Sequence, residues 1–252
     1  MAFSAIALLV AGLLPSFPSA PQSDAVRQIR MQYELLRDEA YNHGQFSRIE
    51  TLYRQACTAV LNADIEECAR KYWLSRVEYM MGRACQSRED LQEAARHYEE
   101  GLELSKASMR DGEFSEGWRM MSENLGQLCV VKWELSKSLG FLIAHGPKVK
   151  DYAARAAELD PRNAAALIIL AAGKIYPPVI FGGNPRKGIE MMNDILLLGS
   201  AEKDDLFNIY SGIALAHGKL NNKQEAVLWF QRSLELYPNN RYIREEYQKI
   251  LD

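Results

Sequence analysis

The chain has 252 residues, of which 48% are apolar and 25% are charged, a composition typical of a folded protein with a substantial core rather than of a disordered chain. Its 30 basic and 33 acidic residues give a formal charge of -3, and no dense basic run occurs. This balance argues against nucleic acid or an anionic membrane surface as a partner.

The first predicted element is a short apolar segment, residues 5–14, which is followed by Pro, Ser and Ala residues. Because it is too short to span a bilayer, we expect residues 1–25 to be an export signal and residues 26–252 to form a single helical-repeat domain, in a periplasmic protein. A cut after Ala20 would leave a proline first, so a cut after Ala25 is chemically easier. The alternative is a buried N-terminal helix or a misassigned start, which would make the protein cytoplasmic.

The cysteines give no sign of a metal site or a lipid anchor. They lack the paired spacings of zinc ligands, and none lies near the N-terminal junction. We therefore expect Cys57, Cys68, Cys85 and Cys129 to be small buried apolar residues. If a helix hairpin turns near residues 61–63, a disulfide between Cys57 and Cys68 is the alternative. No apolar run of about 18 residues follows the N-terminal segment, so no transmembrane span is predicted in the mature chain.

Helical periodicity runs through almost all of the remaining chain, so the fold is predicted to be all-α. The helical pattern also repeats, with small residues where helices must cross closely and an aromatic residue later in each unit. The first copy supplies Tyr33, Leu36, Ala40, Gly44, Tyr53 and Ala56, and the second supplies Gly82, Ala94, Tyr98 and Gly101. A polar stretch, residues 108–117, then indicates a linker or mobile loop.

The third and fourth copies are looser. The third supplies Trp133, Ala153, Ala156 and Pro161, but Ser136 and Lys137 stand where a leucine and a small residue are expected. The fourth supplies Ile169, Gly173, Tyr176, Gly188, Met192 and Ile195. Asp160-Pro161 and Tyr237-Pro238 are expected to end second helices, because proline cannot continue a helix.

The last copy has the most complete pattern: Tyr210, Ile213, Ala214, His217, Ala226, Phe230 and Pro238. It resembles the tetratricopeptide repeat (TPR), a helix-turn-helix unit. The resemblance implies an α-solenoid of antiparallel helix hairpins with about five repeats. Spacings longer than the family's roughly 34 residues make the array irregular. The final residues, 242–252, are typical of an amphipathic capping helix.

The TPR resemblance also indicates where a partner would bind, because first helices line the concave face in that family. Its groove positions fall on Arg76, Tyr79, Arg83, Glu134, Asn208 and Ser211. Arg76 and Arg83 share one helix face with Tyr79 between them, an arrangement able to grip a carboxylate and stack on a planar or apolar group. A solvated charged face is the alternative. The equivalent positions in the fourth copy, Leu167 and Leu170, predict an apolar patch or simply core.

The least regular stretch is YPPVIFGGNPRKG, residues 176–188. Its two glycines have the spacing of a phosphate loop, but a helix precedes it and Ile-Glu follows where Lys and Ser or Thr are needed, so that function is excluded. We predict that the prolines end one helix and that Asn184 caps the next. The surplus apolar residues, Val179, Ile180 and Phe181, are expected to pack over the neighbouring repeat, or otherwise against a ligand or partner.

The region from Ile169 to Met192 also resembles the T-component family associated with TRAP transporters, in its apolar helix ending in prolines and its Phe-Gly-Gly segment opening the next helix. This resemblance implies an exported accessory that binds an apolar ligand or a solute-binding subunit, often as a homo-oligomer. It predicts an apolar cavity near Leu167, Leu170, Pro177 and Phe181.

No catalytic or metal constellation is predicted. The histidines, His43, His97, His145 and His217, are far apart and none has a ligand spacing such as HExxH. The leading hypothesis is a non-catalytic, exported scaffold without a cofactor that presents its concave face to another protein or an apolar small molecule. The TRAP-type accessory is the alternative. An enzyme with an unrecognised site would need several titratable groups in one pocket.

Overall fold

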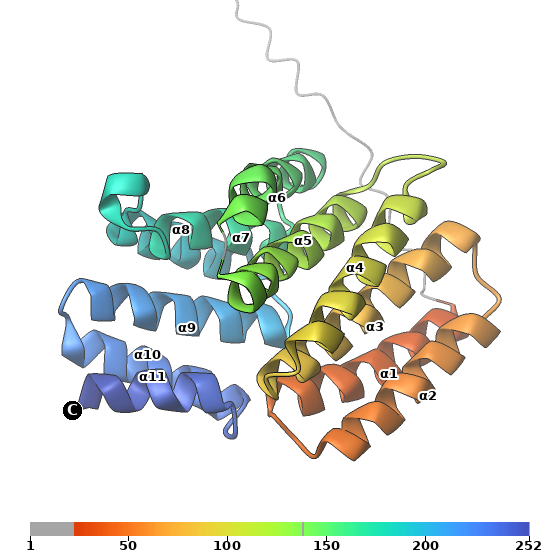
Figure 1. The fold of residues 1–252 in the computed structure, drawn as a ribbon, viewed down its shortest axis with the longest axis horizontal. Coiled ribbons are helices and arrows are strands. Elements are labelled where there is room, and N and C mark those ends of the chain that lie inside the picture. The colour runs from red at the N-terminus through yellow and green to blue at the C-terminus, as the bar shows by residue number, and fades with distance from the viewer. Residues whose placement is uncertain (1–22, 138, 252) are drawn as a thin grey trace, which may run out of the picture.

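The computed structural model describes residues 23–137 and 139–251, which are almost entirely helical (Figure 1). This part of the chain contains no β-strand, and no helix in it is long and apolar enough to cross a bilayer. Of the predicted export signal, only Ser23–Ala25 lie within the described residues. The elements are α1 (Asp24–Tyr41), α2 (Phe46–Asn62), α3 (Glu67–Ser87), α4 (Leu91–Ser108), α5 (Ser115–Ser136), α6 (Gly140–Leu159), α7 (Ala164–Ile175), the 3₁₀ turn η1 (Val179–Phe181), α8 (Pro185–Leu198), α9 (Lys203–Lys219), α10 (Lys223–Leu236) and α11 (Arg241–Leu251).

The α-helices from α1 to α10 pair in chain order into antiparallel hairpins, and α11 packs on the last of them. Each odd-numbered helix also contacts the next odd-numbered helix, so the first helices of the hairpins share one face of the array, here called the concave face. The buried Ile243 anchors α11 on the last hairpin. The predicted all-α array of helix hairpins with a capping helix is therefore confirmed.

Small residues lie at the helix crossings, as their repetition in the sequence predicts. A Cβ atom added to Gly82 on α3 would lie 2.6 Å from the ring of Tyr98 on α4. No real Cβ contact is that short, so the aromatic ring of the second helix can lie against the first helix only because this position is glycine. Tyr98 is completely buried as a result.

Several helix boundaries follow the local signals in the sequence. α6 and α10 end directly before Asp160-Pro161 and Tyr237-Pro238. Asn184 caps α8, because its side-chain oxygen accepts a hydrogen bond from the Lys187 backbone N–H at 3.1 Å, and Pro185 takes the first helical position.

The third hairpin begins earlier than predicted. Its first helix is α5, so Trp133 lies in the last turn of that helix and is 41% exposed instead of opening the repeat. The buried apolar positions of α5 lie upstream, at Met120, Leu125 and Leu128. The repeat pattern matches only the end of this helix. Its polar beginning, Ser115–Gly117, lies within the Gly-containing stretch of residues 108–117 that the sequence indicates as a linker.

The apolar loop before α8 does not pack over a neighbouring repeat, contrary to the prediction. Val179 and Ile180 are 75% and 84% exposed on the 3₁₀ turn η1. The loop is folded back on the end of α7 by a hydrogen bond from the Asn184 N–H to the Lys174 carbonyl at 2.7 Å. This tight turn directs its tip away from the array.

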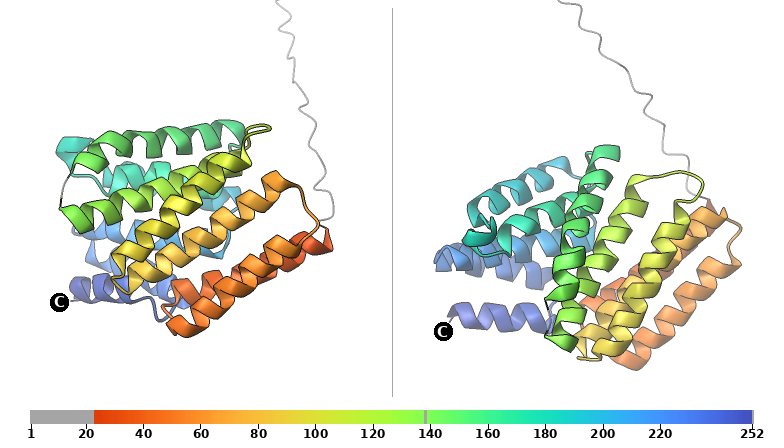
Figure 2. Two further views of the ribbon diagram at one scale, coloured as in Figure 1. Left: turned by 45° about the vertical axis from the view of Figure 1, so that its right-hand side comes forward. Right: turned by 45° about the horizontal axis from the view of Figure 1, so that its top comes forward.

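The first and last hairpins contact each other, so the array closes on itself (Figures 1 and 2). Tyr41 at the end of α1 stacks on Tyr237 with ring centroids 5.0 Å apart, and Phe207 of α9 packs edge-on against both rings at 5.4 and 5.2 Å. The Asn240 side chain donates a hydrogen bond to the Tyr41 carbonyl at 2.7 Å. We call the contacts of α1 and the loop after it with α9, α11 and the loops that precede these two helices the closing seam.

All four cysteines are free thiols, so the alternative of a disulfide between Cys57 and Cys68 is not realised. Cys85 and Cys129 are buried, and burial raises the pKa of each to about 11. These two residues therefore behave as the small apolar residues that the sequence predicts.

Candidate binding site

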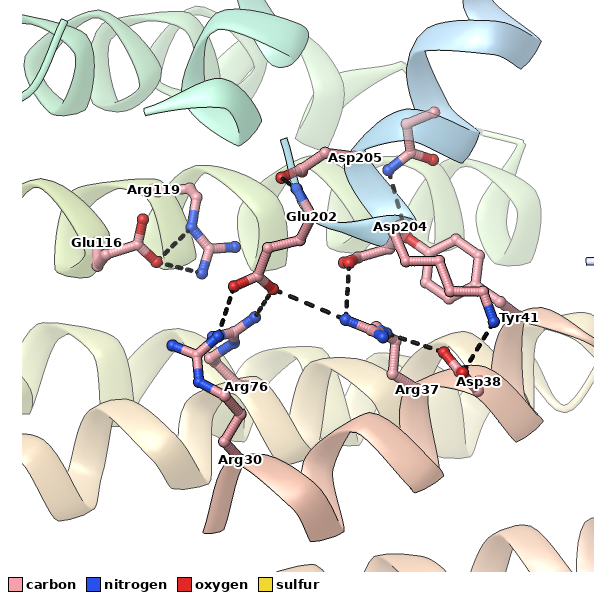
Figure 3. A network of polar contacts seen from close by, with 12 residues as sticks. Arg30, Arg37, Asp38, Tyr41, Arg76, Glu116, Arg119, Glu202, Asp204 and Asp205 are labelled. Carbon is pink, nitrogen blue, oxygen red and sulfur yellow. Dashed lines mark hydrogen bonds and ion pairs between the residues drawn. The ribbon is translucent and has the colours of Figure 1, made fainter. Parts of the chain in front are cut away.

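The concave face is divided between an ionic cluster and a cavity. At the centre of the ionic cluster is Glu202, directly before α9, whose carboxylate contacts Arg30 at 2.8 Å, Arg76 at 3.3 Å and Arg37 at 3.7 Å (Figure 3). The cluster comprises Arg30, Arg37, Asp38, Arg76, Glu116, Arg119, Glu202 and Asp204.

Arg76, one of the predicted groove residues, does grip a carboxylate, but the carboxylate belongs to the same chain. Its guanidinium is buried against the rings of Tyr33, at 4.2 Å, and Trp73, at 5.1 Å, and it also donates to the Tyr72 hydroxyl at 3.3 Å. Glu202 thus occupies the position that a ligand carboxylate would take. Arg76 therefore serves the contact between hairpins rather than an open groove.

Further ionic contacts join α1 to the last hairpin. Arg37 lies 3.2 Å from the Asp204 carboxylate, and Lys203 lies 2.8 Å from that of Asp38. The Tyr237 hydroxyl donates a hydrogen bond to Asp38 at 3.0 Å. The ionic cluster therefore strengthens the closing seam that the aromatic contacts begin.

Glu202 and Glu116 of the ionic cluster both have a lowered pKa. Burial opposes this charge, but Arg76 and Arg30 outweigh it and lower the pKa of Glu202. Burial likewise opposes the charge of Glu116, but Arg119 and Arg76 favour it. The pKa of Glu116 falls to about 2 as a result. Both carboxylates are therefore charged at pH 7, and the attraction of Glu202 for its three arginines is fully developed there.

Beside the ionic cluster, the concave face contains a cavity of about 230 Å³. Side chains of α3, α5, α7 and α9 converge on it, so four successive hairpins contribute to its wall. Its lining residues are Tyr79, Arg83, Ser122, Glu123, Gly126, Gln127, Val149, Ala165, Ile168, Ile169, Ala172, Tyr176, Met192, Asp205 and Asn208. One wall is polar and the opposite wall, built mainly by α7, is apolar.

Arg83 is the cation of the polar wall. Its guanidinium lies 5.2 Å from the centre of the Tyr41 ring, and the Asn208 side chain donates to the Tyr41 hydroxyl at 3.3 Å. Unlike Arg37, Arg76 and Arg119, Arg83 forms no ion pair with a carboxylate anywhere in the described part of the chain. Its charge is therefore compensated only by aromatic rings and more distant groups.

Two acidic residues also line the cavity. The Glu123 carboxylate is held by Arg119 at 2.6 Å, which compensates its charge. Asp205 accepts a hydrogen bond from the Glu202 backbone N–H at 3.0 Å at the start of α9. Burial, with the nearby charge of Asp204, raises the pKa of Asp205 to about 7. At neutral pH the negative charge of this wall is thus partly neutralised.

The structure brings together only some of the predicted site residues. Tyr79, Arg83 and Asn208 line the cavity, and Arg76 lies in the ionic cluster. Ser211 donates to the Phe207 carbonyl of its own helix at 2.7 Å. Glu134, in the last turn of α5, and the predicted apolar set Leu167, Leu170 and Pro177 do not line the cavity, and the side chain of Phe181 lies outside the described part.

The residues that sequence reasoning missed are chiefly those of α5 and α7, such as Gln127, Ile168 and Ile169. α7 is apolar on all sides, so periodicity could not show which of its faces lines the cavity. For α5, the displaced repeat register placed the expected groove residue at Glu134, two turns beyond Gln127.

A second polar cluster lies between α2, α3 and α4. Glu78 accepts a hydrogen bond from the Tyr53 hydroxyl at 2.6 Å and lies 2.6 Å from the His97 ring nitrogen Nδ1. Glu78 and His97 are both buried, so these contacts join neighbouring helices in the interior. Within the described residues, no group of His, Cys, Asp and Glu side chains has the arrangement of a metal site.

One family model and one solved structure agree with this architecture. The tetratricopeptide repeat family matches residues 207–240. The TPR protein TTC0263 of Thermus thermophilus superposes with a TM-score of 0.52 and 15% identity, over 90% of this chain and 98% of that one. YrrB, described as a TPR protein with an unusual peptide-binding site, has a TM-score of 0.36 and 14% identity over 90% of this chain and 92% of its own. No curated protein matches the sequence.

Proposed function

Because residues 207–240 are a tetratricopeptide repeat and the described chain has the helix-hairpin fold of such proteins, we propose that this protein is a non-catalytic binding scaffold. The fold supports an interaction scaffold, and we propose the cavity as its place of binding. The supporting observation is that inner helices of four successive hairpins converge on this cavity. The arginines of the neighbouring ionic cluster are already paired with carboxylates of the same chain. We therefore expect a partner to bind at the cavity and not along the whole concave face.

We also propose that the protein is exported, with residues 1–25 as its signal. The apolar segment of residues 5–14 supports this, and so does its length, which is too short for a membrane span. Mass measurement of the protein from the periplasmic fraction of the producing cells tests the proposal, with a chain that has lost residues 1–25 as the expected result. An intact chain in the cytoplasm would contradict it.

Photo-crosslinking tests the binding function. A photoreactive aliphatic amino acid of about the size of leucine is placed at Ile169, in the cavity wall, and as a matched control at Leu228, which is 52% exposed on α10. Irradiation of the producing cells should give a discrete adduct, protein or small molecule, at Ile169 and none at Leu228. Equal, diffuse labelling at both positions would count against the concave face as the binding surface.

A further inference from the structure

The positive charge of Arg83 in the cavity wall is not balanced by a paired carboxylate of the described chain. A guanidinium carries its charge at every accessible pH and offers five N–H donors in a fixed fork. Arg83 is half-buried, and removing even part of such a group from water is costly unless an anion and hydrogen-bond acceptors compensate it. Arg37, Arg76 and Arg119, on the same concave face, each have a carboxylate within 3.3 Å, whereas Arg83 has none among the described residues.

The residues that surround Arg83 in the cavity favour the binding of an anionic ligand rather than a cationic one. Asn208 and Gln127 are neutral amides on the cavity wall, and Tyr79 adds a neutral hydroxyl. The acidic lining residue on α5, Glu123, is already paired with Arg119 at 2.6 Å. The other acidic lining residue, Asp205, accepts the Glu202 backbone N–H at the start of α9.

The opposite wall limits the rest of the ligand. Val149, Ile168, Ile169, Ala172 and Met192 present hydrocarbon to the cavity. A volume of about 230 Å³ lies below the roughly 300–1,000 Å³ of sites for drug-sized ligands. The cavity therefore suits a compact molecule that is charged at one end and apolar at the other.

We propose that this cavity binds a small monocarboxylate, with its carboxylate on the Arg83 guanidinium and a short branched or cyclic hydrocarbon group against α7. The proposal rests on the proposed binding function of the concave face and names the class of ligand. The planar fork of Arg83 matches a carboxylate through two parallel hydrogen bonds. The aliphatic wall then removes the hydrocarbon part from water.

Isothermal titration calorimetry with 4-methylpentanoate and its neutral isostere 4-methylpentanamide tests the proposal. The acid should bind about 10- to 100-fold more tightly than the amide, because a charged carboxylate strengthens the hydrogen bonds from Arg83. Arg83→Gln should remove this preference, and Arg88→Gln, at the end of the same helix but outside the cavity, should keep it. Equal binding of acid and amide, or an unchanged preference in Arg83→Gln, would overturn the proposal.

A second variant guards against misfolding of the first. Ile169→Phe fills the apolar side of the cavity and leaves Arg83 in place, so it should abolish binding of the acid while the circular dichroism spectrum stays native. A tripeptide with a free C-terminal leucine distinguishes two sources of the carboxylate, a free small acid and the C-terminus of a peptide chain. Weaker binding of the tripeptide supports a free small acid, and tighter binding would overturn it in favour of a chain terminus. If no acid binds but Ile169 still yields a crosslinked partner, the ligand class is wrong and the binding function stands.

Discussion

Glu202 offers a direct test of the closing seam, because one carboxylate faces three arginines from α1 and α3. Glu202→Gln keeps the size of the side chain and removes its charge. Arg76, whose side chain is 7% exposed, would then stay buried without an anion. Removing one partner of a buried ion pair costs about 3–5 kcal/mol. Glu202 itself is 35% exposed, which reduces that figure, and the half-exposed Arg30 pair adds about 0–1 kcal/mol. We expect a loss of about 2–4 kcal/mol in the free energy of unfolding.

Urea unfolding at pH 7, followed by circular dichroism, measures this loss. Glu99→Gln is the matched control, because Glu99 forms one ion pair with Lys132 at 2.8 Å and is 52% exposed. The control should lose less than about 1 kcal/mol. Small-angle scattering should also show a larger radius of gyration for Glu202→Gln if the hairpins separate. A loss below about 0.5 kcal/mol, or one equal to that of the control, would refute the assigned role of Glu202.

Three further changes test other parts of the fold. Burial and neighbouring arginine charges lower the pKa of His43 from 6.5 to about 4. Between these pH values the unfolded chain binds a proton that the folded chain does not, so the free energy of unfolding should fall as the pH drops from 6.5 to 4. His43→Asn should reduce this pH dependence in urea titrations at pH 7, 5.5 and 4.5. Gly82→Ala should cost about 1–3 kcal/mol in the same assay, because its Cβ would lie 2.6 Å from the Tyr98 ring, and an unchanged midpoint would contradict the close crossing. Ser23 caps α1, so a chain cut after Ala25 should be about 1 kcal/mol less stable to heat than the full-length chain; equal stability would show that the cap contributes nothing.

Sequence reasoning succeeded where the determining information was local. The small residue at Gly82 with its aromatic partner Tyr98, the cap at Asn184 and the proline stops are set by neighbours within one hairpin. They were sufficient to predict an all-α array of hairpins. The resemblance to the TPR family then located Tyr79, Arg83 and Asn208, which do lie together in the cavity.

It failed where position depends on groups distant in the chain. Nothing near Arg76 in the sequence reveals that Glu202, 126 residues away, supplies its carboxylate. Nor could the sequence separate Arg76 from Arg83, which share a helix face but lie in the ionic cluster and the cavity respectively. The loop residues Val179 and Ile180 were wrongly assigned to packing, because apolar character alone does not show whether a tight turn directs a side chain outward.

The closing seam also sets the order in which the chain can fold. In an open array of repeats, each hairpin is stabilised by its neighbours, and folding can start anywhere and spread. Here Arg37 and Asp204 are 167 residues apart, and Tyr41 and Asn240 are 199 apart, so their contacts cannot form until the final hairpin has been made. During synthesis, the aromatic and charged residues of the first hairpin that form the closing seam are therefore exposed until the last hairpin has folded. We therefore expect closure to be the last and slowest step of folding, and we expect the two ends of the closed array to unfold together rather than separately.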